Sequence, residues 1–301
     1  MRVFITGASG HVASAVIPEL LQAGHEVVGL ARSDAAAAAV ADLGAGVRRG
    51  DLDDLEGLAD AARDADGVIH LAFKHDAMAA GDLASAAAAD LAALDALGTA
   101  LTGTGKPLVG TSGTAMIPMM GVTGRPGTES DAFDGGYRID AENVLVGLAE
   151  HGVRSSVLRL PPSVHSDLDH HGFVPALIGF ARENGFSGYQ GTGDNRWPAV
   201  HTRDAARLYR LALESAPAGT RLHAVGDEGV PFREIAEAIG RGVGIPTRTV
   251  KPEDAPEVFR FLSAFVSVDN PTSAEITREL MGWKPELPGL IEDLDAGHYF
   301  S

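Results

Sequence analysis

The stretch that decides the fold is VFITGASGHVASAV, residues 3–16. It begins as an apolar run, passes through a glycine-rich turn and ends with helical spacing. Gly7 and Gly10 lie three positions apart, and Ala13 follows three positions later. The first glycine allows a tight turn, the second lets backbone approach a pyrophosphate, and a small third residue lets the helix pack closely on the strand. The stretch therefore predicts a dinucleotide-binding site at the start of the chain.

Strand-like and helix-like segments alternate through the first half of the chain. Strands are predicted over 2–6, 25–31, near 47–51, 67–72, 107–110 and 156–160, and helices over 12–23, 35–43, 55–63, 85–97 and 141–150. Such alternation is typical of a parallel sheet with helices on both faces and right-handed crossovers. We therefore expect an α/β, Rossmann-type, doubly wound dinucleotide-binding domain over residues 1–160.

The alternation ends at Pro161-Pro162. Helices are predicted over 174–182, 204–214 and 232–240, with irregular segments between them, and residues 221–225 could add a strand to the first sheet. We expect a smaller, mostly helical substrate-binding part over 161–301, with residues 200–228 added back to the first domain.

Composition excludes several classes of function. The net charge is −17 and no basic cluster offsets it, so the average field repels nucleic acid. Apolar runs are interrupted before they reach the length of a membrane span. The chain contains no Cys, which excludes disulfides and thiol nucleophiles. We expect a cytoplasmic protein that acts on a small molecule, without nucleic-acid or membrane partners, alone or as a homodimer.

The end of the second predicted strand bears on the type of cofactor. Ala31 stands where NAD-binding chains usually carry an acidic residue for the ribose 2′-hydroxyl. Arg32 and Ser33 follow, and a guanidinium with a hydroxyl suits a 2′-phosphate. This favours NADP(H) over NAD(H), although Arg32 could be a solvated loop residue and Asp34 could serve a ribose.

Two further strand ends predict cofactor contacts. Asp51 and Leu52 follow the third strand and would lie near the adenine, unless Asp51 is the N-cap of the next helix. Leu71 and Ala72 follow the fourth strand and would line the middle of the cofactor. His70 could join them or could be a hydrogen-bonded core histidine.

Together these residues resemble the extended short-chain dehydrogenase/reductase superfamily, in its NAD-dependent epimerase/dehydratase group. The resemblance covers nearly the whole chain and rests on residues 6–13, 50–52, 70–72, 111–113, 158–162 and 200–206. It is specific for the fold and not for a substrate. It implies cofactor contacts at Gly7, Ser9, Gly10, His11, Val12, Thr111, Arg138 and Pro161.

The family's catalytic set is a Ser or Thr after the strand at 107–110, followed by a Tyr and a Lys four positions apart. The Lys lowers the Tyr pKa and holds the ribose, the Tyr transfers a proton, and the Ser or Thr orients the substrate oxygen. Here the Ser position falls on Gly113, beside Ser112 and Thr114 as substitutes. No Tyr in the chain is followed by Lys four residues later.

Two alignments of residues 134–142 are possible. In the first, Tyr137 is the family Tyr and Ala141 replaces the Lys. In the second, Glu142 matches the acidic residue often found four positions after the Lys, which puts Arg138 in the Lys position and Asp134 in the Tyr position. We prefer the second, with Tyr137 facing the pocket from the preceding turn. Arg138 and Glu142 could also be a simple i,i+4 ion pair.

The segment PPSVHSDLDHHGFVP, residues 161–175, follows the strand whose end borders the substrate in the family. We expect no metal there, since the family needs none, and we expect His165 or His171 to supply the proton that the missing Tyr would have given. Apolar pocket lining is assigned to Phe73, Met116, Tyr189 and Trp197. His201 and Asp204 are expected to have structural roles.

Three functions follow from this reading. We prefer an NADPH-dependent reductase of a small carbonyl, enone or imine, because an activated acceptor does not need a strong protein acid. A non-catalytic NADP(H)-binding sensor would also fit the missing Tyr–Lys pair. A sugar-nucleotide epimerase or dehydratase is disfavoured, because oxidation of a hydroxyl requires a base like the missing Tyr.

Overall fold

The computed structural model describes residues 1–74, 77 and 82–301, and the side chain of Tyr137 also lies outside the described part. At its centre is a seven-stranded sheet in the order β10-β6-β5-β4-β1-β2-β3, with every neighbouring pair parallel. The strands are β1 (Arg2–Thr6), β2 (Glu26–Ala31), β3 (Gly46–Arg49), β4 (Gly67–His70), β5 (Pro107–Gly113), β6 (Arg154–Leu160) and β10 (Thr220–His223). This confirms the predicted Rossmann-type fold, with its topological switch point between β1 and β4.

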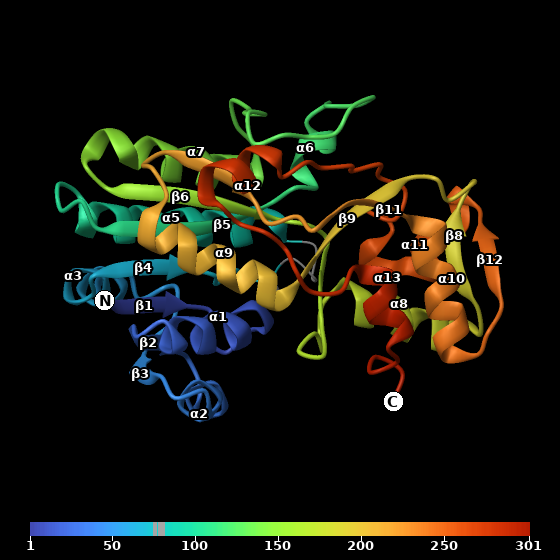
Figure 1. Cartoon of the computed structure of the whole chain (residues 1–301), viewed down its shortest axis with the longest axis horizontal. Coiled ribbons are helices and arrows are strands. Elements are labelled where there is room, and N and C mark those ends of the chain that lie inside the picture. Colours follow the sequence, from blue (N-terminus) through green and yellow to red (C-terminus); the bar gives the residue numbers. More distant parts are fainter. Residues whose placement is uncertain (75–76, 78–81) are drawn as a thin grey trace.

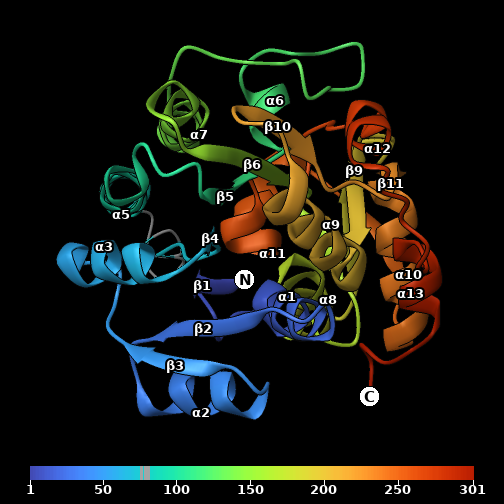
Figure 2. The ribbon, with the colours of Figure 1, turned by 60° about the vertical axis from the view of Figure 1, so that its left-hand side comes forward.

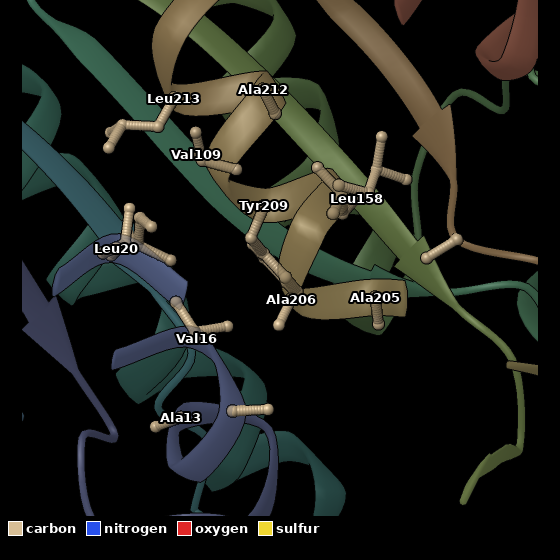
Figure 3. Close-up of a cluster of buried hydrophobic side chains, with 14 of the residues drawn as sticks. Ala13, Val16, Leu20, Val109, Leu158, Ala205, Ala206, Tyr209, Ala212 and Leu213 are labelled. Atoms are coloured by element: carbon tan, nitrogen blue, oxygen red, sulfur yellow. The ribbon is translucent and has the colours of Figure 1, made fainter. Parts of the chain in front are cut away.

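Helices cover both faces of this sheet (Figures 1 and 2). One face carries α1 (His11–Gln22), α2 (Asp34–Asp42) and α9 (Thr202–Ser215), and the other carries α3 (Leu55–Asp64), α5 (Leu83–Leu101) and α7 (Tyr137–Gly147). Each face has its own apolar core. Figure 3 shows Ala13 and Val16 of α1 beside Ala206 and Tyr209 of α9, so the small residue predicted at position 13 lies in a close helix contact.

The strand β5 is longer than the sequence predicts. It continues from Pro107 through Gly113 and pairs with β6 up to the register of Gly113 with Leu160. Residues 111–113 therefore lie within the strand, because the regular ladder with β6 extends past the apolar run that predicted it.

The second part of the chain lies at the carboxyl-terminal ends of the sheet strands (Figure 1). Its helices are α8 (Phe173–Asn184), α10 (Phe232–Val243), α11 (Ala255–Phe259) and α13 (Leu290–Asp295), which enclose their own apolar core. The region also contains strands where the sequence predicts irregular segments: β7 (Ser163–His165), β9 (Arg196–His201) and β11 (Asp227–Pro231) form one small sheet, and β8 (Ser187–Gln190) pairs with β12 (Thr247–Val250). These strands are too short to produce a clear alternating pattern.

The remaining described elements are short. They are α6 (Met116–Met119), α12 (Glu275–Met281) and 3₁₀ turns at Leu148–His151, Pro252–Asp254 and Arg260–Leu262. As predicted, β10 joins the first sheet, since Thr220 pairs with Ser156 of β6.

The helix α5 is, among the described residues, the one that is long and apolar enough to cross a membrane by length and composition. It packs against α3 and α7 and buries Leu94, Leu97 and the charged Asp90. These contacts are those of a core helix that covers the sheet.

Candidate functional site

The glycine-rich turn joins β1 to α1 at the carboxyl edge of the sheet. Gly7 has φ +66°, and a Cβ built on it would lie 2.7 Å from the backbone N of Ala72. The Gly10 N–H donates to the Gly7 carbonyl at 2.9 Å, and Gly10 precedes the first residue of α1. No acidic residue occurs in the first helical turn, whose N–H groups can therefore receive an anion such as a diphosphate. The cradle fits a dinucleotide cofactor.

The chain after β4 follows this turn closely. The Ala72 N–H donates to Thr6 Oγ1 at 3.3 Å, and the Leu71 N–H donates to the Thr6 carbonyl at 3.3 Å. Both residues are half-buried beside the turn, where the sequence predicts cofactor contacts.

For Asp51, which follows β3, the structure contradicts one of the two predicted roles. Asp51 is exposed, and its Oδ1 accepts from the Asp53 N–H at 2.8 Å. The N-cap of α3 is Asp54, whose carboxylate accepts from the Gly57 N–H. The alternative in which Asp51 caps this helix is therefore wrong, because the helix begins later. Leu52 is buried in the apolar core below.

The ends of β2 and β3 bring two arginines near the start of α2. Arg32 is exposed directly after β2. Ser33 is the N-cap of α2, and its Oγ accepts from the Ala36 N–H at 3.1 Å. Asp34 forms an ion pair with Arg49, which lies opposite Ala31 in the sheet register.

Arg138 lies in the first turn of α7. Its guanidinium donates to the carbonyl of Thr111 in β5 and to Asp90 Oδ2 at 3.4 Å. The guanidinium carbon also lies 4.3 Å from the ring centroid of Phe73. These contacts place a cation at the carboxyl ends of β4 and β5.

Asp90 extends this contact into a buried chain. Its Oδ1 lies 3.0 Å from Nε2 of His70, and Nδ1 of His70 lies 2.8 Å from Thr6 Oγ1. In a neutral imidazole, Nε2–H would donate to the carboxylate and the Thr6 hydroxyl would donate to Nδ1. His70 is thus the hydrogen-bonded core histidine that the sequence left as one alternative. Sequence reasoning missed Asp90, although it falls on the buried stripe of α5 defined by residues 86, 90, 93, 97 and 101.

The neighbours of Arg138 on α7 bear on the two alignments. Ala141 is 4% exposed and packs in the apolar core, so a Lys side chain there would point into that core. Glu142 is buried against Arg159, and its Oε1 also accepts from Arg221 Nε at 2.7 Å. It therefore does not form the simple i,i+4 pair with Arg138. This geometry favours the alignment with Arg138 in the Lys position.

Burial alone would raise the pKa of Glu142. The hydrogen bonds and charges of Arg159 and Arg221 outweigh that effect and hold the pKa of this carboxyl below its usual range. Asp134, which takes the family's Tyr position in the preferred alignment, is exposed ahead of the helix. Tyr137 is the first residue of α7, and its side chain, predicted to face the pocket, lies outside the described part.

The hydroxyl groups on and after β5 differ in their partners. Thr111 Oγ1 donates to the His70 carbonyl at 2.9 Å and lies 2.8 Å from the Tyr209 hydroxyl. Thr114 Oγ1 accepts from Asn270 at 3.0 Å. Ser112 Oγ is buried without a hydrogen-bond partner among the described residues. Among the described residues, Ser112 is therefore the one of the two predicted substitutes whose hydroxyl has no hydrogen-bond partner.

The histidines after β6 are separated by burial. His165 is fully buried in β7, and its Nδ1 contacts Asp293 Oδ2 at 2.9 Å. His171 is exposed. The predicted proton donor His165 is therefore held inside the second part by α13 rather than presented at the sheet edge. Within the residues that the structure describes, no group of three His, Asp or Glu side chains is arranged as metal ligands.

Two predicted pocket residues lie elsewhere. Trp197 is 1% exposed and packs against Phe232 in the core of the second part, because its side of β9 faces that core. Tyr189 lies on β8, where Arg233 stacks on its ring. Phe73, under Arg138, and Met116, the first residue of α6, remain near the end of β5 and are half-buried.

His201 and Asp204, which the sequence predicts to have structural roles, both hydrogen-bond to the backbone. His201 is the N-cap of α9 and accepts from the Arg203 N–H at 3.2 Å. Asp204 is buried and accepts from the N–H groups of Glu286 and Leu287. These bonds fasten the C-terminal segment to the helix.

Comparison with known proteins agrees with this architecture. Residues 3–225 match the model of the NAD dependent epimerase/dehydratase family. An uncharacterized protein of Schizosaccharomyces pombe is 45% identical over 300 residues, which cover 100% of both chains.

Two solved structures share the fold across the whole chain. A dTDP-glucose 4,6-dehydratase from Streptomyces venezuelae with NAD bound has a TM-score of 0.79 and 19% identity, covering 100% of this chain and 96% of that one. A UDP-glucose 4-epimerase from Thermotoga maritima has the same TM-score and identity and covers 100% and 98%. The chain therefore belongs to the NAD-dependent epimerase/dehydratase family, and its fold and glycine-rich turn support a nicotinamide cofactor and an NAD(P)-dependent, oxidoreductase-type function.

Proposed function

We propose that the protein is an NADP(H)-dependent reductase of a small, polarised acceptor: a carbonyl, an enone or an imine. The observation that carries this proposal is the cation of Arg138 at the end of β5, backed by Asp90, with an exposed Asp134 where the family has its Tyr. The corner formed by the end of β5 and the start of α7 thus has a group that can hold a ribose or an anionic substrate atom. It has no described phenol in the family position.

The preference for NADP(H) rests on the ends of β2 and β3. A 2′-phosphate next to Ala31 would meet Arg32 and the start of α2, where backbone N–H groups favour negative charge. Asp34 is neutralised by Arg49, so it is poorly suited to accept from a ribose hydroxyl in an NAD-specific manner.

The residues of this chain would bind and orient, while bound NADPH would supply the hydride. The turn at Gly7 and Gly10 would hold the diphosphate. The guanidinium of Arg138, which lies over the Phe73 ring, would stand close to the acceptor. An iminium carbon that gains a hydride becomes a neutral amine without needing a proton. An enone that gains a hydride becomes an enolate and a carbonyl becomes an alkoxide, and each takes its proton from water.

The same corner argues against transient oxidation of a sugar hydroxyl. That chemistry removes a hydroxyl proton, and the carboxylate of Asp134 is a weaker base than a phenolate. The dehydratase and epimerase with the same fold act on sugar nucleotides, but at 19% identity their likeness concerns the fold alone.

The test is a titration of the purified protein with NADPH, followed by a panel of iminium ions, enones and aldehydes monitored by loss of NADPH absorbance. We expect binding, turnover of at least one activated class, and weaker binding in Arg138→Ala. Arg241→Ala is the matched control, because Arg241 forms an exposed ion pair with Asp295 in the second part.

Binding without turnover across the panel would point instead to a non-catalytic NADP(H) sensor, which the missing Tyr–Lys pair also allows. Turnover that is unchanged in Arg138→Ala would overturn the role given to this corner. Tyr137→Phe separates the remaining case, because a loss of turnover with unchanged NADPH affinity would identify Tyr137 as the proton donor.

A further inference from the structure

A cluster of titratable side chains outside the catalytic corner joins the glycine-rich turn to the second part. His11 is the first residue of α1, and its side chain contacts residues far along the chain. Its Nε2 lies 2.8 Å from Oγ1 of Thr202 in α9, and its Nδ1 lies 3.6 Å from Oδ1 of Asp169. Asp169 in turn contacts the hydroxyl of Tyr299, near the C-terminal end, at 3.3 Å.

The hydrogen bonds of Thr202 decide the tautomer of His11. The Thr202 hydroxyl donates its single proton to the carbonyl of His165 at 3.1 Å and accepts from Ser166 Oγ at 2.9 Å. The His11 nitrogen near it must therefore donate, so Nε2 carries the hydrogen. In a neutral His11, Nδ1 is then unprotonated and faces a carboxylate oxygen.

Asp169 is itself poorly solvated. It is 3% exposed, and Oδ1 accepts from the Gly172 N–H at 2.8 Å. Burial raises its pKa to about 6, although the bonds from Gly172 and Tyr299 oppose the shift. Burial also lowers the pKa of His11 to about 4, with further lowering by His170, His165 and His171. Near neutral pH the free pair thus carries one negative charge, which disappears as the pH falls below about 6.

Other charged or titratable groups lie on the elements packed around the pair. They are His165, His170 and His171 after β6, His201 at the end of β9, Arg203 of α9, and Asp293, His298 and Tyr299 of the C-terminal part. Arg203 is neutralised by Asp167, with Nη1 2.7 Å from Oδ1, and His165 contacts Asp293. The charge of His165 favours the Asp169 carboxylate in part, but burial outweighs it and the pKa of Asp169 stays raised.

We propose that the His11–Asp169 pair takes up a proton when the cofactor's diphosphate binds at the start of α1, so that cofactor affinity falls as the pH rises. The proton would lie between His11 Nδ1 and Asp169 Oδ1. The inference rests on the proposed cofactor and adds a regulation of the same site. Its physical basis is that the backbone of His11 forms the anion-binding turn while its side chain faces a buried carboxylate, so diphosphate charge and carboxylate charge repel each other.

The sign of the effect follows from linkage. Any ligand that binds better to the protonated pair raises the proton affinity of that pair, and protons are then taken up on binding. Between the apparent pKa values of the free and bound pair, affinity should fall by up to about tenfold per pH unit.

The test is calorimetric titration of the full chain with NADPH at pH near 7 in two buffers of different ionisation enthalpy, which gives the protons taken up per cofactor. The variants are Asp169→Asn, which keeps the acceptor for Gly172, and Asp167→Asn as the matched control. Asp167 is exposed and pairs with Arg203 instead of His11. The 2′-phosphate of NADPH titrates in the same range, but its contribution cancels when wild type and variant bind the same ligand.

We expect the wild type and Asp167→Asn to take up more protons per NADPH than Asp169→Asn, with a difference approaching one proton. Equal proton uptake in all three proteins, with binding intact, overturns this inference and leaves the proposed function standing. No NADPH binding by the wild type overturns the proposed function and this inference with it. If Asp169→Asn does not fold, His11→Gln serves instead, since its amide can still donate to Thr202, and it should show the same loss of proton uptake.

Discussion

The glycine-rich turn and the corner formed by β5 and α7 face the same edge of the sheet, yet they relate differently to the family pattern. The turn keeps the spacing of Gly7, Gly10 and Ala13, and Gly7 has the positive φ that this spacing requires. In the alignment that we prefer, the corner has Gly113 and Asp134 where the family has its hydroxyl and its Tyr, and Arg138 where it has Lys. A backbone cradle depends on conformation and close approach, whereas a proton-transfer set depends on side-chain chemistry. Binding of the cofactor can therefore persist while the chemistry at the corner changes.

The largest expected effect tests what holds the corner in place. In Glu142→Gln, the buried Arg159 and the half-buried Arg221 lose their counterion, and we expect a loss of about 3–5 kcal/mol in the free energy of unfolding. Because the folded pKa of Glu142 lies below its usual value, its contribution is present above the unfolded pKa and disappears as the pH falls through the folded pKa.

Urea unfolding of both proteins near pH 7 and at acidic pH measures this. The difference in unfolding free energy between the wild type and Glu142→Gln should become smaller below about pH 4. Glu150→Gln, at an exposed position, should change stability by less than about 0.5 kcal/mol. A gap that stays constant into the acid range would mean that the Glu142 charge contributes nothing.

The next effect tests the turn. In Gly7→Ala the new Cβ would lie 2.7 Å from the Ala72 backbone N at φ +66°, so we expect about 3 kcal/mol of destabilisation and loss of measurable NADPH binding. Gly24→Ala is the matched control, since Gly24 has φ +82° with nothing within 4 Å. It should lose only about 1 kcal/mol for the left-handed conformation. Equal losses in the two variants would show that the approach of Ala72 does not matter.

A moderate effect tests the cation at the corner. Arg138→Gln removes the charge at the end of β5, and we expect NADPH affinity to fall about tenfold, or about 1.4 kcal/mol. Arg138→Lys restores a charge that cannot contact Asp90 and the Thr111 carbonyl together, so the loss should be smaller but not zero. Fluorescence titration with NADPH measures both. Equal losses in Lys and Gln would show that geometry, rather than charge, is what Arg138 contributes.

The smallest effect tests cofactor choice. Arg32 is exposed after β2, so Arg32→Ala should change stability by less than about 0.5 kcal/mol. We expect the preference for NADPH over NADH to fall about fivefold, or about 1 kcal/mol, through weaker NADPH binding alone. Parallel titrations with the two cofactors measure this. A matching loss for NADH would assign Arg32 to the shared part of the cofactor.

Much of the fold was readable in the sequence, because it rests on local patterns. The strands β1, β2 and β4 and the helices between them follow apolar periodicity, and even β10 was predicted near residues 221–225. The strands of the second part were not predicted. Each is three to six residues long and owes its pairing to partners far along the chain, as when β7 pairs with β9.

The candidate site shows the same difference between what local sequence patterns predict and what distant contacts decide. The sequence by itself determined the positions that chemistry requires: the glycine spacing, the missing Tyr–Lys pair and the arginine at 138. Only the tertiary structure decided their partners, since burial and contact between distant segments set a side chain's charge and hydrogen bonds. It alone joined Arg138 to Asp90 and brought His11 to Asp169, across 48 and 158 positions of sequence.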